Sequence, residues 1–107
     1  MSQYKMFIDD ERYPPEPSYA WLVCRTFGEV KEMIRKYGCP SMISFDHDLG
    51  ENEPTGMDIA KWLVNTDLDE SGKFLPPNFT FTVHSQNVAG ASNIYGLLGQ
   101  YLGQRVK

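Results

Sequence analysis

Four short apolar segments alternate along the chain with longer segments whose apolar positions recur every three or four residues. The short segments lie at 4–8, 19–25, 42–46 and 79–84, and they contain many aromatic and β-branched residues, which favour strands. Strands that alternate with helices are typical of a parallel sheet with helices packed against it. The pattern therefore predicts an α/β fold.

Three segments have the spacing of amphipathic helices. The first follows Thr26, which with Glu29 forms a helix-start signal, and it stops at Gly38. The second follows Thr55 and the third follows Asn87. Their predicted inner faces hold the apolar residues Phe27, Val30, Met33, Ile34 and Tyr37, then Ile59, Ala60, Leu63 and Val64, and finally Ile94, Leu97, Leu98, Tyr101 and Leu102.

Two connections lack helical character. Residues 13–18 include three prolines, which fix φ and remove backbone donors, so a loop is predicted where an α/β fold usually places its first helix. Residues 66–78 are polar and end in Pro76-Pro77-Asn78, and we predict a mobile connection there. We expect one domain over residues 1–107, a small three-layer sandwich with a mainly parallel four-stranded sheet and no fifth strand.

Composition narrows the classes of function. The 107 residues are 41% hydrophobic and 22% charged, as in an ordinary globular domain. The net charge of −4 and the lack of a long basic run argue against binding to a DNA duplex. No apolar run approaches the roughly 20 residues of a membrane span, so we expect no membrane contact. Cys24 and Cys39 are expected to be reduced and buried, in a cytoplasmic protein.

Polar clusters follow three of the predicted strands. They are Asp9-Asp10, Asp46-His47-Asp48 and His84-Ser85-Gln86-Asn87. Right-handed crossovers place the carboxyl ends of parallel strands on one edge of the sheet, where ligands bind in open α/β folds. The sequence therefore predicts one acidic site that contains histidine.

The acidic residues suit a magnesium ion. Three carboxylates within about 5 Å repel pairwise by roughly 3 kcal/mol at an effective dielectric constant of 20, so such a cluster needs a counter-charge or a proton. Either Mg²⁺ or an arginine, Arg12 or Arg25, would supply that charge. Alternatively, these carboxylates cap a turn or are solvated in loops. The predicted metal ligands are Asp9, Asp10, Asp46 and Asp48.

Of the two histidines, His84 is the better candidate for general acid–base catalysis because it ends a strand at the predicted edge. Strict strand alternation turns His47 to the opposite face, where it would pack against a helix. Ser85 would contact phosphate or cap a helix. Arg12 and Arg25 suit bidentate phosphate contacts, or else pair with nearby glutamates. The predicted substrate-binding residues are Arg12, Arg25, Ser85 and Asn87.

The chain resembles a response-regulator receiver domain. An acidic pair ends the first strand, Asp48 ends the third, Gly56 follows eight residues later, and Ser85 ends the fourth. Four strings, at 8–14, 44–50, 55–58 and 83–87, look more closely like the cyclic-phosphate-processing receiver-like family. The most specific parts are Phe-Asp-His-Asp-Leu-Gly at 45–50 and Val-His-Ser at 83–85.

The resemblance implies a receiver-like fold and a small phosphorylated nucleotide-type ligand. It implies that Asp10 and Asp48 hold Mg²⁺ within an acidic pocket that also includes Asp9 and Asp46. His47 and His84 would be the acid and base, with Arg12 and Ser85 on the phosphoryl group. The family is inferred to hydrolyse or bind cyclic phosphates on nucleotides or ADP-ribose.

Three classes of function stay open at this point. The first is a phosphoesterase that opens a cyclic phosphate, by attack of water or through a transient phosphoryl group on Asp48. The second is a module that binds a phosphorylated nucleotide or protein partner without turnover. The third is a phosphorylatable receiver. A two-histidine phosphoesterase needs two His-x-Ser/Thr motifs, and both His47-Asp48-Leu49 and His84-Ser85-Gln86 lack that pattern.

Overall fold

The computed structural model describes residues 4–105, and its four strands form one parallel sheet in the order β2-β1-β3-β4. The strands are β1 Lys5–Ile8, β2 Trp21–Cys24, β3 Met42–Phe45 and β4 Thr80–Val83. Each neighbouring pair is parallel, with Ile8 opposite Cys24 and Phe45, and Phe45 opposite Val83. The predicted α/β fold with a four-stranded parallel sheet is confirmed, and all four strands end on the same edge.

The three α-helices begin where the sequence predicts. They are α1 Phe27–Tyr37, α2 Gly56–Asp69 and α3 Val88–Gln104. Thr26 accepts a hydrogen bond from the backbone N–H of Glu29, and Asn87 caps α3 through the N–H of Gly90. Thr55 and Asp58 form a reciprocal capping box at the start of α2. These side chains satisfy backbone donors that a helix leaves unpaired at its first turn.

Several strand ends differ from the prediction by one residue, and two element boundaries differ by more. The second strand starts at Trp21 and not at residue 19, because a short 3-10 helix, η1 Ser18–Ala20, closes with a bond from the N–H of Ala20 to the carbonyl of Pro17. Helix α2 continues to Asp69, so the prediction of a connection from residue 66 is wrong for residues 66–69. Burial of Asp67 against α3 explains this extension. The hydrogen bond from Tyr101 stabilises the last turn of α2, and the polar sequence of that turn gives no sign of it.

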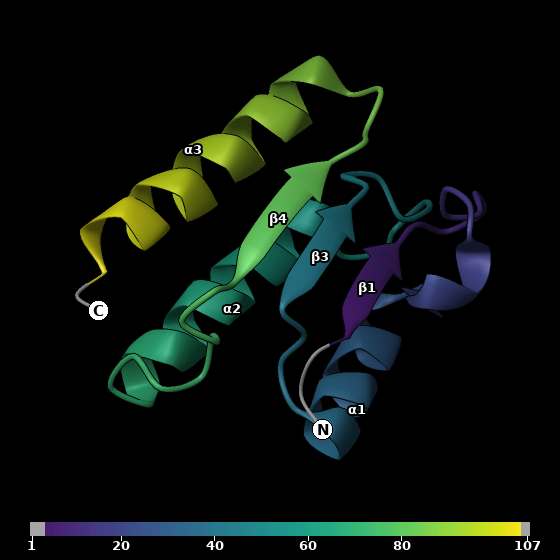
Figure 1. Ribbon diagram of the computed structural model, residues 1–107. Coiled ribbons are helices and arrows are strands. Elements are labelled where there is room, and N and C mark those ends of the chain that lie inside the picture. Colours follow the sequence, from purple (N-terminus) through teal and green to yellow (C-terminus); the bar gives the residue numbers. More distant parts are fainter. Residues whose placement is uncertain (1–3, 106–107) are drawn as a thin grey trace.

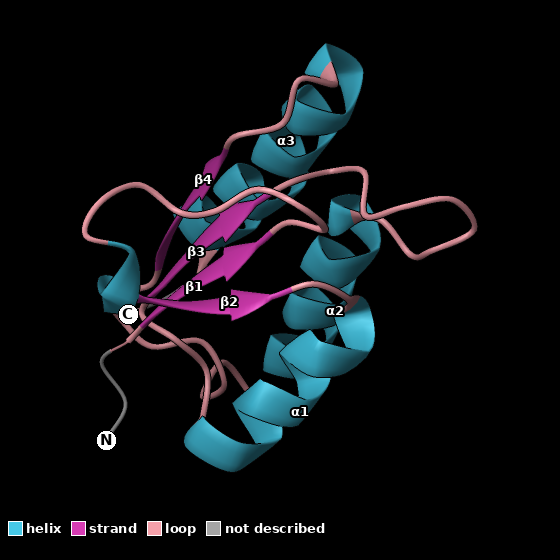
Figure 2. Ribbon diagram, turned by 90° about the vertical axis from the view of Figure 1, so that its right-hand side faces the viewer, coloured by secondary structure: helices cyan, strands magenta, loops and turns pink. Residues whose placement is uncertain are grey.

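The helices lie mainly on one side of the sheet. Figures 1 and 2 show α1 and α2 behind the strands and α3 alongside β4, while the loop after β1 and η1 lie near the opposite face. In residues 4–105 that opposite face is not covered by an α-helix. None of the described helices has the length and apolar character that crossing a membrane requires. The core contains alternate strand residues and the inner helix faces, including Met6, Ile8, Cys24, Ile43, Phe45, Val30, Ile59, Leu63, Ile94 and Leu98.

A buried carboxylate anchors the end of the molecule opposite the polar strand ends. Asp67 is fully buried, and its Oδ1 accepts bonds from the backbone N–H groups of Phe74 (3.0 Å) and Leu75 (2.8 Å). Its Oδ2 accepts bonds from the hydroxyl of Tyr101 (2.6 Å) and from Arg105 (3.2 Å). Burial raises the pKa of Asp67, but the bonds from Tyr101, Leu75, Arg105 and Phe74 outweigh it and lower the pKa overall.

We predict that Asp67→Asn destabilises the fold by about 3 kcal/mol at neutral pH, because it leaves the Arg105 cation without its buried partner. The folded-state pKa of Asp67 lies below its unfolded value, so this stabilisation is present above the unfolded pKa and is lost as pH falls through the folded one. Urea unfolding at neutral pH and near pH 3 should therefore show a smaller difference between variant and wild type in acid.

The matched control is Asp69→Asn, an exposed residue at the end of the same helix, whose free energy of unfolding should stay within about 0.5 kcal/mol of wild type. An Asp67→Asn penalty of the same size at both pH values would contradict the assignment.

Candidate functional site

Three carboxylates meet at the carboxyl ends of β1 and β3. The N–H of Asp9 bonds to the carbonyl of Cys24 (3.1 Å) and the N–H of Asp46 to that of Ile8 (2.9 Å), so sheet pairing continues by one residue on each strand. Asp9 and Asp46 are buried, and Asp10 is exposed. One carboxylate oxygen from each of the three lies within 4.8 Å of the other two. The structure thus brings together three of the four predicted acidic residues.

The pKa values of Asp9 and Asp46 are shifted in opposite directions. Burial raises the pKa of Asp9, but the backbone N–H groups of Arg12 and Glu11 and the side chain of His84 lower it below its ordinary value. The pKa of Asp46 is raised by burial and by the charge of Asp9, which together outweigh a hydrogen bond with Ser85. Negative charge is therefore concentrated beyond what the neighbouring donors neutralise, and a cation would relieve it.

The two oxygens of Asp9 have separate roles. Oδ1 accepts hydrogen bonds from the N–H groups of Glu11 and Arg12, both at 2.9 Å, so Asp9 caps the turn after β1. Oδ2 lies 3.0 Å from Nε2 of His84 and 3.6 Å from Nε of Arg12. The turn-capping alternative is correct for one oxygen, while the other faces the groups predicted to do chemistry.

His84 is held at both ring nitrogens. Nε2 contacts Asp9, and Nδ1 lies 2.7 Å from the hydroxyl of Ser44. The imidazole also stacks on Phe7, with ring centroids 4.4 Å apart and an interplanar angle of 5°. This places His84 against the acidic cluster, as the sequence predicts. The contacts favour a role in holding Asp9, because neither nitrogen is directed at solvent.

His47 and Asp48 form a second pair at the start of α3. Nδ1 of His47 lies 3.0 Å from Oδ1 of Asp48, and the amide of Asn87 lies 3.3 Å from Oδ2. The bonds from His47 and Asn87 lower the pKa of Asp48. The His47 ring packs against Gly90, where a Cβ atom would collide with it. The interpretation of His47 as packed against a helix thus fits, and the same ring fixes the exposed Asp48 carboxylate.

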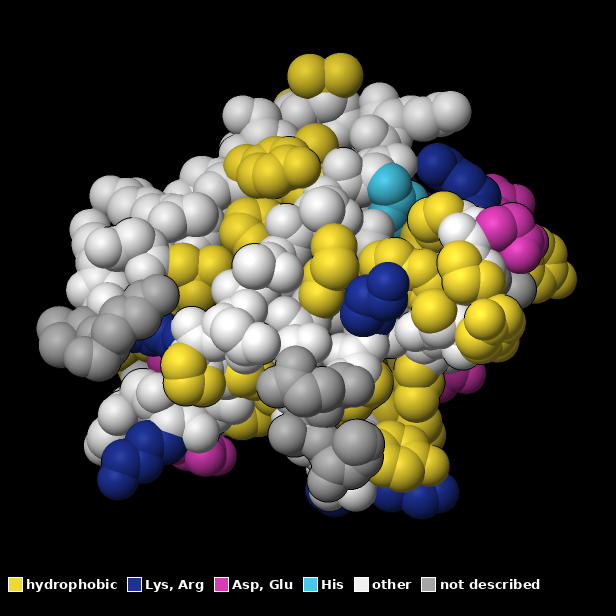
Figure 3. Space-filling view, viewed as in Figure 1, with side chains coloured by type: hydrophobic (Ala, Val, Ile, Leu, Met, Phe, Trp, Pro, Cys, Tyr) yellow, Lys and Arg dark blue, Asp and Glu magenta, His cyan; other side chains and the backbone are white. Residues whose placement is uncertain are grey.

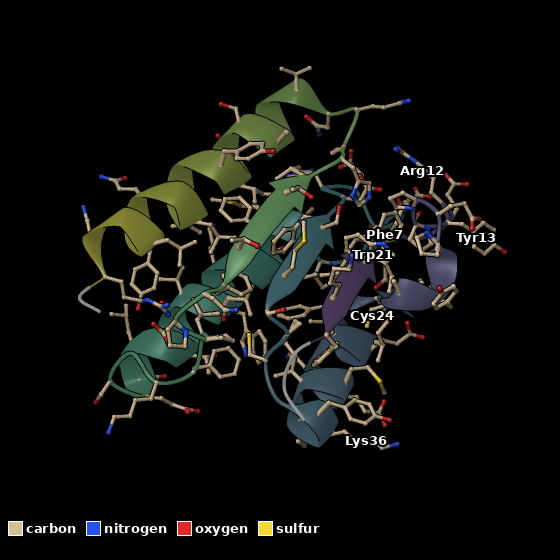
Figure 4. The ribbon with its side chains drawn as sticks, in the orientation of Figure 1. Phe7, Arg12, Tyr13, Trp21, Cys24 and Lys36 are labelled. Atoms are coloured by element: carbon tan, nitrogen blue, oxygen red, sulfur yellow. The ribbon has the colours of Figure 1, made fainter. Side chains whose placement is uncertain are left out.

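These groups surround an open pocket of about 290 Å³ at the strand ends. Figure 3 shows histidine, basic and acidic side chains gathered at this corner of the molecule, and Figure 4 shows Arg12 beside the ends of β3 and β4. A larger groove of about 530 Å³ lies between α1 and α2, away from the polar strand ends. The residues that line the smaller pocket are Asp10, Glu11, Arg12, Asp46, Asp48, Gly50, Ser85, Gln86 and Asn87.

Three of the four predicted substrate-binding residues line this pocket: Arg12, Ser85 and Asn87. Ser85 accepts a bond from the N–H of Asn87 (3.0 Å), so it caps the turn before α3 as well. Arg25 is not among the lining residues. Its guanidinium donates to the carbonyls of Asp9 (2.9 Å) and Arg12 (2.6 Å), and it supports the loop from the side away from the pocket.

Sequence reasoning missed Ser44 and Phe7, which contact His84, and Thr82, which contacts Ser44. Ser44 and Thr82 are register partners in β3 and β4, and the hydroxyl of Thr82 donates to that of Ser44 at 3.0 Å. A small polar residue in the middle of a buried strand was the available signal, since every other residue of β3 is apolar. Its partner could be identified only once the strand register was known.

Comparison with known proteins gives one match. Residues 4–100 match the model of a family described as the cyclic-phosphate processing receiver domain. No curated protein and no solved structure matches the chain at the significance required. The matched range includes all four strands and every residue of the pocket.

We predict that Gly56→Ala destabilises the protein by roughly 1–3 kcal/mol, because the new Cβ would collide with the backbone carbonyl of Asp46. The N–H of Gly56 also bonds to the carbonyl of His47 at 2.7 Å, so the close approach fixes the segment that carries Asp46. Urea unfolding measures the loss. The control is Gly96→Ala in α3, where a Cβ has nothing within 4 Å and helix propensity favours alanine. Equal stability of Gly56→Ala and wild type would contradict this prediction, because it would show that the backbone at Asp46 can move away from the added Cβ.

Proposed function

Because this chain belongs to the family of cyclic-phosphate processing receiver domains, we propose that it opens the cyclic phosphate of a nucleotide-type ligand by hydrolysis. The observation that carries the proposal is the convergence of Asp9, Asp10 and Asp46 beside Arg12 at one open pocket. Carboxylates that hold a cation, together with an accessible guanidinium, are the groups that phosphate chemistry requires.

The donor set fits Mg²⁺. The ion prefers hard oxygen ligands and is usually bound through one or two carboxylates, with water or phosphate oxygens completing its shell. The raised pKa of Asp46, caused by burial and by the charge of Asp9, is the signature of a site that needs positive charge. Asp9, Asp10 and Asp46 would hold the ion. When bound, Mg²⁺ supplies Lewis-acid polarisation of a phosphoryl oxygen.

Arg12 is the phosphate-binding side chain in this proposal. Its side chain is 43% exposed, and one Nη donates to the backbone carbonyl of His84 at 3.2 Å, which sets the direction of the guanidinium. Its position on the pocket wall leaves N–H groups accessible to a phosphate oxygen. The contact would neutralise charge on the ester while Nε of Arg12 stays 3.6 Å from Oδ2 of Asp9.

Hydrolysis adds a water oxygen to phosphorus, breaks one ring P–O bond and delivers a proton to the leaving oxygen. We assign the proton exchange to the His47–Asp48 pair. Asp48 lines the pocket with its side chain 65% exposed, and it lies 3.0 Å from Nδ1 of His47. A proton taken from water can be shared within this pair and returned to the leaving oxygen. His84, with both nitrogens engaged, instead keeps Asp9 in place.

The decisive assay follows adenosine 2′,3′-cyclic phosphate and ADP-ribose cyclic phosphate by ³¹P NMR, with Mg²⁺ and with a chelator. We expect turnover that chelation abolishes, and a loss of at least about 100-fold in Asp46→Asn, since a ligand to the cation is removed. Glu51→Gln, an exposed loop acid next to the pocket wall, is the matched control and should keep full activity.

Saturable binding of these compounds in calorimetry, with no product formed, would contradict hydrolysis and show that the protein binds the cyclic phosphate without turnover. If the protein neither binds nor hydrolyses these compounds, both functions are contradicted.

Tyr13 supports a nucleotide-type ligand over a simple phosphate ester. Its side chain is 80% exposed and directly follows Arg12. The guanidinium of Arg25 lies 5.2 Å from the ring centroid, and Arg25 is itself fixed by two backbone carbonyls. Pro14, the next residue, is buried. Tyr13 is thus held in place although it is exposed, near Arg12 of the pocket wall (Figure 4), and its ring suits stacking with a base.

We predict that Tyr13→Ala raises KM for adenosine 2′,3′-cyclic phosphate by roughly tenfold, the effect of losing one stacked base, and that Tyr13→Phe does not. KM for a cyclic phosphate that lacks a base, such as ethylene phosphate, should stay unchanged. Tyr19→Ala, which removes an aromatic ring 90% exposed on η1, is the control and should behave as wild type. An equal rise in KM for both substrates would contradict base stacking.

A further inference from the structure

Two hydroxyl groups lie in line with His84 on the sheet face that α1 and α2 do not cover. The hydroxyl of Thr82 donates to Oγ of Ser44 at 3.0 Å, and Oγ of Ser44 lies 2.7 Å from Nδ1 of His84. On the far side of the ring, Nε2 lies 3.0 Å from Oδ2 of Asp9. Four side chains from β1, β3, β4 and their ends thus form one continuous chain of hydrogen bonds.

The direction of these bonds follows from the chemistry of the two ends. Asp9 is an ionised carboxylate that only accepts, so a bare nitrogen lone pair at 3.0 Å would be repelled and Nε2 must carry the hydrogen. In a neutral imidazole, Nδ1 is then an acceptor. Ser44 satisfies it, since its oxygen already accepts from Thr82 and its own hydrogen is available to donate.

Packing leaves the ring little freedom to adopt another arrangement. Ser44 is 6% exposed, and the face of His84 is stacked on Phe7. Phe7 in turn is in edge contact with Trp21, with centroids 5.9 Å apart. Rotation of the imidazole would break both hydrogen bonds and the stacking together. Asp9 requires the Nε2–H form, and a hydroxyl that donates to Nδ1 then fixes the ring at its other nitrogen.

We propose that Ser44 is a positioning residue: its hydroxyl, oriented by Thr82, donates to Nδ1 and holds the His84 ring, as the Nε2–H tautomer, in the position from which it binds and orients Asp9. The consequence for Mg²⁺ rests on the proposed function, whereas the tautomer itself does not. Oδ1 of Asp9 is fixed by the N–H groups of Glu11 and Arg12, so the bond from His84 is what fixes Oδ2. Without Ser44, Nδ1 loses its partner, and the ring loses the bond that holds Nε2–H on that oxygen.

The direct test is long-range ¹H–¹⁵N NMR of the His84 imidazole in the full chain at neutral pH. We expect the Nε2–H tautomer with a hydrogen-bonded Nδ1 in wild type, and in Ser44→Ala a Nδ1 ¹⁵N shift moved toward that of a nitrogen without a hydrogen bond. Ser44→Thr, which keeps the hydroxyl and suits a strand, should restore the wild-type spectrum. Thr82→Val removes only the outer donor and should keep the Nε2–H form. A wild-type His84 that is the Nδ1–H form, a mixture or an imidazolium would overturn the proposal.

A titration with Mg²⁺ alone separates this inference from the proposed function. Ser44→Ala should bind Mg²⁺ roughly tenfold more weakly than wild type, which is the usual effect of removing a residue that orients a metal ligand. Ser44→Thr should recover the affinity. Equal affinity in Ser44→Ala and wild type would overturn the positioning role. If wild type shows the Nε2–H tautomer but binds no Mg²⁺, the proposed function fails while the tautomer assignment stands.

Discussion

The ionised, fully buried carboxylate of Asp9 is the constraint on which the site depends. Taking a carboxylate out of water is costly unless hydrogen bonds replace its hydration. Two backbone N–H groups do so at Oδ1, and they turn the chain directly after β1. A histidine from the end of β4 does so at Oδ2, across the intervening strand β3. One residue therefore joins a loop to a sheet edge, and the loop carries three of the residues that line the pocket, Asp10, Glu11 and Arg12.

Most of the fold and part of the site could be predicted because their determinants are local or topological. Thr26, Thr55 and Asn87 each act on an N–H group three residues away, so their role is visible in the sequence. The meeting of Asp9 and Asp46 follows from parallel topology, which aligns strand ends whatever the side chains are. Asp48 does not join that trio, because the chain leaves the strand direction after Phe45 and alternation no longer determines where a side chain points.

The interactions that escaped prediction are those between distant segments. Asp67 is no different in sequence from an exposed helix-end aspartate; it is buried because Tyr101 and Arg105, more than 30 residues away, meet it. Ser44 contacts His84 only through the β3–β4 register. Both carboxylates, Asp9 and Asp67, are buried and have lowered pKa values, although they lie at opposite ends of the molecule. Their surroundings differ. Asp67 accepts hydrogen bonds from a tyrosine and an arginine, whereas Asp9 lies beside two further carboxylates.

The loop that replaces a helix after β1 has a physical consequence for the site. In a helix starting there, the first N–H groups would point along the helix axis and be available to a ligand. Here Asp9 itself accepts those of Glu11 and Arg12, so in the proposed function the phosphate would have to be bound by side chains, and Arg12 is on the pocket wall. Arg25 then bonds to the carbonyls of the same turn, which keeps Arg12 and Tyr13 at a fixed distance from the carboxylates. The proposed function thus places charge neutralisation and ligand recognition on one short loop that is anchored at two points, and a change that loosens Asp9 would disturb both.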